Sequence, residues 1–281
     1  MNRKALQRER GRLLEKRGLL VVSHGSRELG WVDLVDDTIN SVSSRLAPEL
    51  IVEAVFLELV EGRLIQDGID RLLAEGVTEA LALPLFVSSG STHANEIGWA
   101  LGAYPEPGTE TELELFELGG LRIDYGHPMG EAPEIQSIVL DRLKRLSEEP
   151  SEESILLIGH GSEEAGFRES WERELGGIAE RAAAQGGYRS WATALLLPNQ
   201  VGERIAEIRR DRPDHRILTV GLFLSEGYFT RTVIPRHLES SGGLEACRYD
   251  GAALMPHPGV AAWVERQARE WLERLEQVKR R

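Results

Sequence analysis

The stretch that decides the fold is LLVVSHGS at residues 19–26, because it returns in closely similar form as ILLIGHGS at residues 155–162. Four apolar residues followed by small and polar ones are typical of a buried strand that ends in a turn. The two copies lie 136 residues apart in a chain of 281 residues. A repeat of that length indicates a duplicated unit, so we expect two domains of the same fold.

Each copy is followed by the residue spacing of an amphipathic helix. Apolar residues recur every three or four positions, as Val32, Val35, Ile39, Val42 and Leu46 in the first half and as Phe167, Trp171, Leu175 and Ile178 in the second. Further strands are predicted at 51–57 and 80–87, and in the second half at 191–197 and 216–224. Helical patterns separate them, so each half reads strand, helix, strand, helix, strand.

Each half is expected to close with one more strand and one more helix. The strands are predicted at 112–118 and 244–249, and the helices at 135–146 and 260–275. Short strands that alternate with helices predict a parallel sheet covered on both faces. The expected fold class is therefore α/β, with two tandem doubly wound parallel-sheet domains at 18–147 and 154–281. The acidic segment 148–153 contains Pro150 and lacks large apolar residues, as expected of a linker.

Composition excludes several classes of function. The formal net charge of −13 argues against nucleic-acid binding, which depends on Lys and Arg. We expect no membrane partner, because the chain lacks an apolar run of about 18 residues. A single cysteine, Cys247, cannot form an internal disulfide or hold an iron–sulfur cluster, and it fits the cytoplasm. Residues 1–17 carry seven Lys or Arg and lack the apolar region of a secretory signal, so we expect a basic extension outside the fold.

Polar candidates for a functional site follow three predicted strands of the first half. His24 follows the first strand, Glu58 follows the second, and His93 ends the polar loop after the third. Ligands bind beyond the carboxyl ends of the strands in open parallel sheets, so we expect these side chains around one pocket. Two imidazoles and a carboxylate suit Fe²⁺, Co²⁺ or Ni²⁺. Each residue alone also has an ordinary interpretation, as a strand cap, a solvated acid and an exposed loop histidine respectively.

The second half provides a comparison within the same chain. His160 matches His24. The same alignment of the two halves places Ala194 opposite Glu58 and Thr230 opposite His93. Because the second half is expected to fold without these two groups, they are expected to serve chemistry rather than folding. The comparison predicts one active site and leaves open whether His160 is structural or functional.

These segments resemble the class II chelatases, specifically the sirohydrochlorin cobaltochelatases and ferrochelatases of cobalamin and siroheme biosynthesis. The resemblance covers about residues 18–281 and is carried by residues 23–26, 57–58 and 84–93. It implies two chelatase-like lobes and a lyase that inserts a divalent metal into sirohydrochlorin. It also implies that His24, Glu58 and His93 are the catalytic residues and the metal ligands.

Further residues near the strand ends are expected to contact the substrate. They are Ser26, Arg27, Arg63, Ser89, Gly90, Ser91 and Thr92. We expect no organic cofactor, since the metal is a substrate, and a cytoplasmic monomer whose two lobes mimic a dimer. The same ligands would serve a carrier that binds metal or tetrapyrrole without catalysis, so that alternative stays open.

Overall fold

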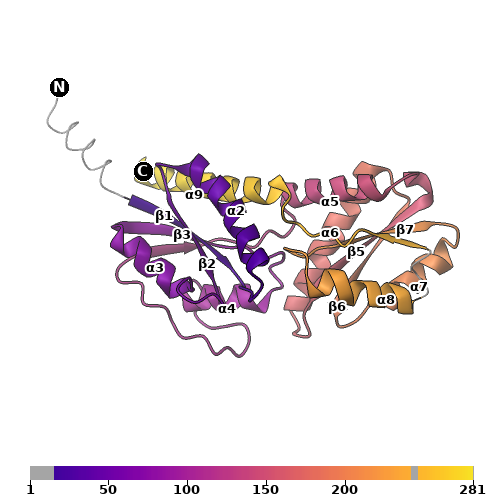
Figure 1. The fold of residues 1–281 in the computed structure, drawn as a ribbon, viewed down its shortest axis with the longest axis horizontal. Coiled ribbons are helices and arrows are strands. Elements are labelled where there is room, and N and C mark those ends of the chain that lie inside the picture. Colours follow the sequence, from indigo (N-terminus) through magenta and orange to yellow (C-terminus); the bar gives the residue numbers. More distant parts are fainter. Residues whose placement is uncertain (1–15, 242–245, 281) are drawn as a thin grey trace, which may run out of the picture. The chain divides into compact units, whose positions relative to one another are not determined.

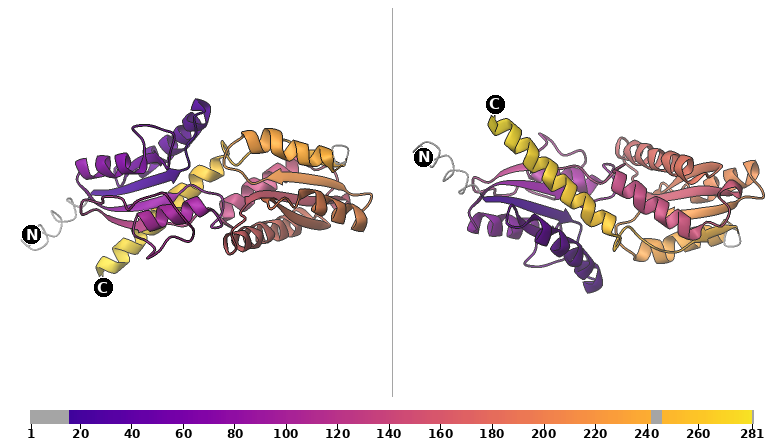
Figure 2. Two further views of the ribbon diagram at one scale, coloured as in Figure 1. Left: turned by 90° about the horizontal axis from the view of Figure 1, so that it is seen from below. Right: turned by 90° about the horizontal axis from the view of Figure 1, so that it is seen from above.

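The computed structural model describes residues 16–241 and 246–280, which fold around two parallel sheets (Figure 1). The first sheet has the order β2-β1-β3-β4, and the second has the order β6-β5-β7-β8. The strands of the first sheet are β1 (Lys16–Ser23), β2 (Ile51–Phe56), β3 (Val77–Pro84) and β4 (Arg122–Tyr125). Those of the second sheet are β5 (Glu153–Gly161), β6 (Ser190–Leu197), β7 (Arg216–Gly221) and β8 (Cys247–Tyr249). Helices lie on both faces of each sheet (Figure 2), so the predicted fold class is confirmed.

The helices follow the predicted apolar spacing. The first half contains α2 (Leu29–Leu46), α3 (Ile65–Ala74), α4 (Thr92–Ala100) and α5 (Pro133–Leu146). The second contains a 3-10 turn (Pro150–Glu152), α6 (Phe167–Gly186), α7 (Val201–Asp211), a π-helical turn (Phe229–Val233), α8 (Ile234–Ser240) and α9 (Pro258–Arg280). All five residues of the predicted stripe on α2 are buried. None of the helices in the described ranges is long and apolar enough to cross a membrane.

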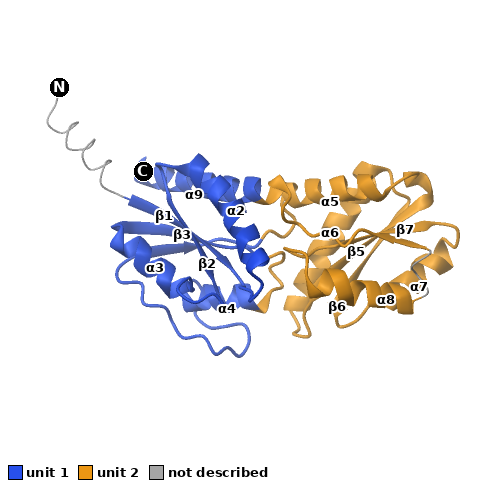
Figure 3. Ribbon diagram, viewed as in Figure 1, with its two compact units in different colours: residues 1–85, 93–128, 261–281 blue, residues 86–92, 129–260 orange. Residues whose placement is uncertain are grey.

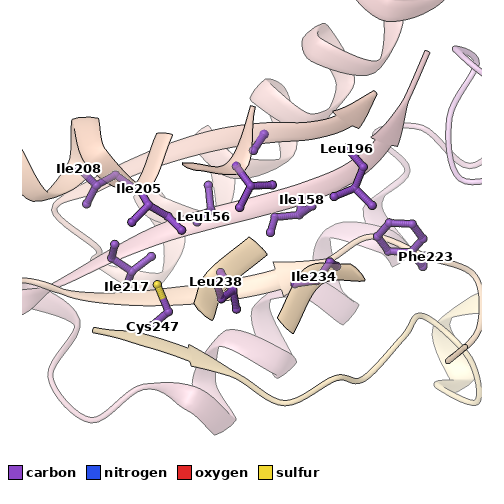
Figure 4. Close-up of a cluster of buried hydrophobic side chains, with 12 residues drawn as sticks. Leu156, Ile158, Leu196, Ile205, Ile208, Ile217, Phe223, Ile234, Leu238 and Cys247 are labelled. Atoms are coloured by element: carbon purple, nitrogen blue, oxygen red, sulfur yellow. The ribbon is translucent and has the colours of Figure 1, made fainter. Parts of the chain in front are cut away.

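Burial explains why the repeated stretch forms the centre of each sheet. Residues 19–22 of β1 are fully buried, because β1 lies between β2 and β3 and is covered on both faces. The matching strand β5 contributes Leu156 and Ile158 to a cluster with Ile205, Ile217 and other apolar side chains (Figure 4). A strand buried on both faces carries consecutive apolar residues rather than an alternating pattern, as both copies do.

The predicted strand at residues 112–118 is wrong. The fourth strand is β4, which pairs with Glu79–Ala82 of β3. The alternating sequence of residues 112–118 imitates a strand, yet Leu115 is 64% exposed. The peptide groups of Glu117 bond to the side chain of Gln66 instead of joining a ladder. The corresponding prediction at 244–249 is met by β8 from residue 247, and residues 244–245 lie outside the described part.

The compact units differ from the expected boundaries in the placement of the closing helices (Figure 3). Of the described residues, the first unit comprises 16–85, 93–128 and 261–280, and the second comprises 86–92, 129–241 and 246–260. In the second unit, Arg142 of α5 donates to the carbonyl oxygen of Gly221 at 2.7 Å. In the first unit, the indole of Trp271 on α9 donates to Asp124 on β4 at 2.6 Å. Each closing helix therefore packs on the sheet of the other half of the sequence.

The expected linker and extension are also partly absorbed into the folded units. Glu153, which ends the expected linker, is buried at the start of β5 and accepts hydrogen bonds from Ser147 and Glu148. At the other boundary, Lys16 and Arg17 belong to β1, and residues 1–15 of the expected extension lie outside the described residues. Arg17 can join the strand because Glu276 pairs with its guanidinium at 3.3 Å.

Candidate functional site

The ends of β1 and β2 hold His24 and Glu58 side by side. The backbone N–H of Glu58 donates to the carbonyl oxygen of His24 at 3.1 Å, which extends the pairing of the two strands. Between them, Gly25 has a φ of +105°, and a Cβ atom there would overlap the carbonyl oxygen of Glu58. Only glycine fits this turn, so the residue after His24 sets how closely the two strand ends approach.

The third predicted ligand joins the other two in the first unit. His93 lies in the first turn of α4, and its ring meets that of His24 edge to face, with centroids 4.7 Å apart. The Nε2 atom of His24 lies 3.7 Å from the Oε1 atom of Glu58. All three side chains are partly open to solvent, with exposed fractions of 39% for His24, 52% for Glu58 and 46% for His93. The structure thus brings the three predicted residues together.

A cavity of about 820 Å³ opens beside His93 and is strongly acidic. Its lining includes four carboxylates from Glu58, Glu96, Glu110 and Glu112. No Lys or Arg of the described ranges lines it. A concave surface lined by one sign of charge concentrates ions of the opposite sign, so this cavity favours cations.

One residue of this site was missed by the sequence analysis. Glu96 accepts a hydrogen bond from Nδ1 of His93 at 2.6 Å and another from the hydroxyl of Thr111 at 2.5 Å. The sequence contained a signal for the first contact, because residues three apart share one face of a helix and Glu96 follows His93 by three. The contact with Thr111 joins residues that are 15 positions apart in the chain, so no local sequence pattern indicates it.

The side chains do not form a closed metal site as they stand. Within residues 16–241 and 246–280, no group of three or more His, Cys, Asp or Glu converges closely enough to hold a metal ion. Each imidazole has its Nδ1 atom engaged, His24 with the carbonyl oxygen of Gly25 at 3.2 Å and His93 with Glu96. The two Nε2 atoms, with the carboxylate of Glu58, are left as candidate donors to a cation.

The predicted substrate contacts at Ser26, Arg27 and Arg63 differ in their surroundings. The hydroxyl of Ser26 accepts the backbone N–H of Glu28 at 3.1 Å, and Arg27 is exposed beside it. Arg63 instead forms a two-pronged ion pair with Asp36, at 2.6 and 2.7 Å, and lies over the ring of Phe56. These hydrogen bonds to Asp36 raise the pKa of Arg63 above its ordinary value.

The predicted contacts in the loop before His93 belong to the second unit. Ser89 donates both its hydroxyl and its backbone N–H to Glu174, and Gly90 is so close to Trp171 that a Cβ atom would overlap the indole. Ser91 and Thr92 complete the turn that leads into α4. Ser89 and Gly90 are thus part of the second unit, whereas the two imidazoles and Glu58 belong to the first.

The matching turn of the second unit corrects the predicted equivalence of Glu58 and Ala194. Ala194 pairs with Ile158 as Val55 pairs with Val22, so the counterpart of Glu58 is Leu197 and not Ala194. Gly161 also confirms this register, because a Cβ atom there would overlap the carbonyl oxygen of Leu197.

In the second unit, Phe229 takes the place that His93 has in the first. The ring of His160 meets that of Phe229 edge to face at 4.9 Å, and Thr230, the expected equivalent of His93, is buried instead. The π-helical turn at this point changes the phase of the side chains relative to α4. The second unit thus keeps one imidazole and replaces the other two polar groups by Leu197 and Phe229.

Comparisons with known proteins agree with this fold. Residues 18–146 match the family model described as CbiX. A sirohydrochlorin ferrochelatase of Priestia megaterium is 26% identical over 179 residues, which cover 63% of this chain and 61% of that protein. The chain thus matches less than two thirds of that relative's length.

For a second relative and for a solved structure, the match covers nearly the whole length of the other protein. A sirohydrochlorin cobaltochelatase of Methanopyrus kandleri is 28% identical over 136 residues, which cover 45% of this chain and 94% of that protein. The solved structure of SirB from Bacillus subtilis with Fe³⁺ has a TM-score of 0.71 and 23% identity, and covers 91% of this chain and 95% of that one. The resemblance to the sirohydrochlorin chelatases predicted from the sequence is therefore confirmed, and it is carried by the match of residues 18–146 to the CbiX family model and by these relatives.

Proposed function

We propose that the protein is a sirohydrochlorin chelatase that inserts Fe²⁺ or Co²⁺ into the tetrapyrrole ring, in siroheme or cobalamin biosynthesis. The observation that carries the proposal is the edge-to-face pair of His24 and His93 beside Glu58, at the edge of an acidic cavity. The ferrochelatase and cobaltochelatase relatives support both the ring and the two metals.

The charge of the cavity suits the metal rather than the ring. Four carboxylates attract a divalent cation. Sirohydrochlorin is itself a polycarboxylate, so the same field repels it. The cavity is therefore the side from which the metal reaches the imidazoles.

The open ligand set suits an ion that must leave again. A structural metal site closes with four protein ligands, whereas a site for reaction keeps positions open. Two imidazoles and one carboxylate leave positions for the pyrrole nitrogens of the ring. An ion held in this way can pass from the imidazole nitrogens of the protein to the pyrrole nitrogens of the ring without first returning to water.

Insertion also requires two pyrrole N–H protons to leave the ring. A neutral imidazole or an ionised carboxylate can accept such a proton. Glu58 is half-exposed and lies 3.7 Å from Nε2 of His24, so it is placed to pass a proton from the site to solvent.

The proposal is tested by following the absorbance of sirohydrochlorin with Fe²⁺ or Co²⁺ and a small amount of protein, without oxygen for iron. We expect many turnovers for the wild type and a loss of at least about 100-fold for His93→Ala, because this change removes a ligand itself and the loss of a ligand's outer partner alone typically costs about 10–100-fold. His160→Ala is the matched control, because His160 has the same backbone contact and lies beside Phe229 instead of a second imidazole. Equal losses in the two variants would contradict a single site.

The carrier alternative gives a different result in the same assay. A carrier would bind Co²⁺ yet leave the rate of insertion at its spontaneous value, even with one protein per ring. That outcome would replace the enzymatic proposal.

A further inference from the structure

We propose that Glu96 is a positioning residue that fixes the tautomer of His93, so that its Nε2 atom presents a free lone pair to the metal. This inference rests on the proposed function and deepens it. Glu96 lies on α4 with a side chain that is 16% exposed, and its Oε1 atom is 2.6 Å from Nδ1 of His93.

The chemistry of the hydrogen bond decides where the ring proton resides. An ionised carboxylate has acceptor atoms only, so Nδ1 of His93 must carry the hydrogen that joins it to Glu96. In the neutral ring this leaves Nε2 without a proton and available as a ligand. Histidines that bind metals commonly donate their other N–H group to a carboxylate or a carbonyl oxygen, which fixes the ring and raises its basicity.

His24 is held in the equivalent way by its own backbone. Its Nδ1 atom lies 3.2 Å from the carbonyl oxygen of Gly25, which is also an acceptor only. Both imidazoles therefore direct Nδ1 to an acceptor and keep Nε2 for a cation. His93 cannot use the same backbone contact from the first turn of a helix, and Glu96 supplies the acceptor instead.

Thr111 holds the carboxylate in place. Its hydroxyl donates to Oε2 of Glu96 at 2.5 Å and accepts the backbone N–H of Leu113 at 3.1 Å. The single hydrogen of the hydroxyl is thus committed to Glu96. With Oε1 and Oε2 both engaged, the carboxylate has a fixed orientation towards His93, and Thr111 acts on the metal site through Glu96.

The tautomer can be measured without metal, by long-range correlation of the imidazole nitrogens in ¹⁵N-labelled protein. The signals of His93 are those lost in His93→Ala. We expect Nδ1–H in the wild type and a large population of Nε2–H in Glu96→Ala, because an unconstrained imidazole favours Nε2–H. Glu96→Gln keeps the shape of the side chain and should also populate Nε2–H, because its amide group can donate to Nδ1.

The consequence for the metal is measured by titration with Co²⁺. We expect the dissociation constant to rise by about 10–100-fold in Glu96→Ala and Glu96→Gln. Glu114→Gln is the matched control, because it removes the same charge from an exposed position of the irregular segment that contains Thr111, and this variant should bind Co²⁺ as the wild type does. Thr111→Val should weaken binding by less than the changes at Glu96.

The inference is overturned if His93 remains Nδ1–H in Glu96→Ala, or if both variants at Glu96 match the control in Co²⁺ affinity. Wild-type protein that binds no Co²⁺ would overturn the proposed function together with the metal-directed role of Glu96. Wild-type protein that binds and inserts Co²⁺, with variants at Glu96 that do the same, would overturn the role of Glu96 alone.

Discussion

The two strand-end glycines provide a matched pair of perturbations. Gly25 and Gly161 have φ values of +105° and +82°, and at both a Cβ atom would overlap the carbonyl oxygen of the neighbouring strand. Alanine at a positive φ costs about 1–2 kcal/mol. Relief of the overlap requires the strand ends to separate, and a lost hydrogen bond there costs about 1 kcal/mol. Gly25→Ala and Gly161→Ala should therefore each destabilise their unit by about 2–3 kcal/mol.

The effect on metal insertion should differ sharply between the two variants. Separation of the strand ends in Gly25→Ala moves Glu58 away from His24, and a misplacement of about 1 Å can cost 100-fold in rate. In Gly161→Ala the displaced residue is Leu197, so the folded protein should insert metal at the wild-type rate. Denaturation followed by circular dichroism gives the stabilities, and ring absorbance gives the rates. Equal loss of activity in two equally stable, folded variants would refute the assignment of the site to the first unit.

Two further predictions concern the second unit. Burial raises the pKa of the Cys247 thiol to about 11, and the thiolate is the reactive form. Native protein at pH 8 should thus resist a disulfide reagent such as dithionitrobenzoate, whereas denatured protein should react with one equivalent; rapid native reaction would contradict the burial. Ile205→Ala should destabilise the protein by about 2–5 kcal/mol in urea denaturation. The exposed Val278→Ala should change stability by less than about 0.5 kcal/mol, and similar losses would place Ile205 outside the core.

The fold was largely predictable, because the strongest signals were local. A buried central strand carries consecutive apolar residues, and α2 carries its buried stripe at regular spacing, so both are visible in short windows. The prediction at 112–118 failed because alternating residues also occur in an exposed connection. An alternating pattern describes only the side chains, whereas a strand also needs a neighbouring strand to pair with its peptide groups. Residues 79–82 of β3 pair with β4 and not with residues 112–118.

The placement of the closing helices could not be predicted from either helix. α5 and α9 each present an apolar stripe, and the two duplicated sheets offer similar surfaces to cover. Sequence order favours the nearer sheet. In the structure, polar contacts such as Arg142 with Gly221 and Trp271 with Asp124 join each helix to its sheet, and they link residues far apart in the chain.

The candidate site was predictable to the extent that it follows strand ends. His24, Glu58 and His93 come directly from that rule and lie together. Arg63 was chosen by the same rule but is engaged by Asp36. Its partner lies on another element, so this ion pair has no local signal in the sequence. The sequence aligned Glu58 with Ala194 instead of Leu197 because the connection from β5 to β6 is three residues longer than the connection from β1 to β2. Only the pairing of the strands reveals this difference in length.

The strand ends around His24 and around His160 have closely similar geometry, so a metal site can be introduced into the second unit. The ring pairs have centroid distances of 4.7 and 4.9 Å and interplanar angles of 76° and 84°. Leu197→Glu with Phe229→His should therefore create a second Co²⁺ site, and equilibrium dialysis should show two bound ions in place of one. The new histidine would have Thr232 three residues later, where His93 has Glu96. The second ion should thus bind about 10–100-fold more weakly than the first. A folded variant that binds one ion at every Co²⁺ concentration would show that the backbone frame does not specify the site.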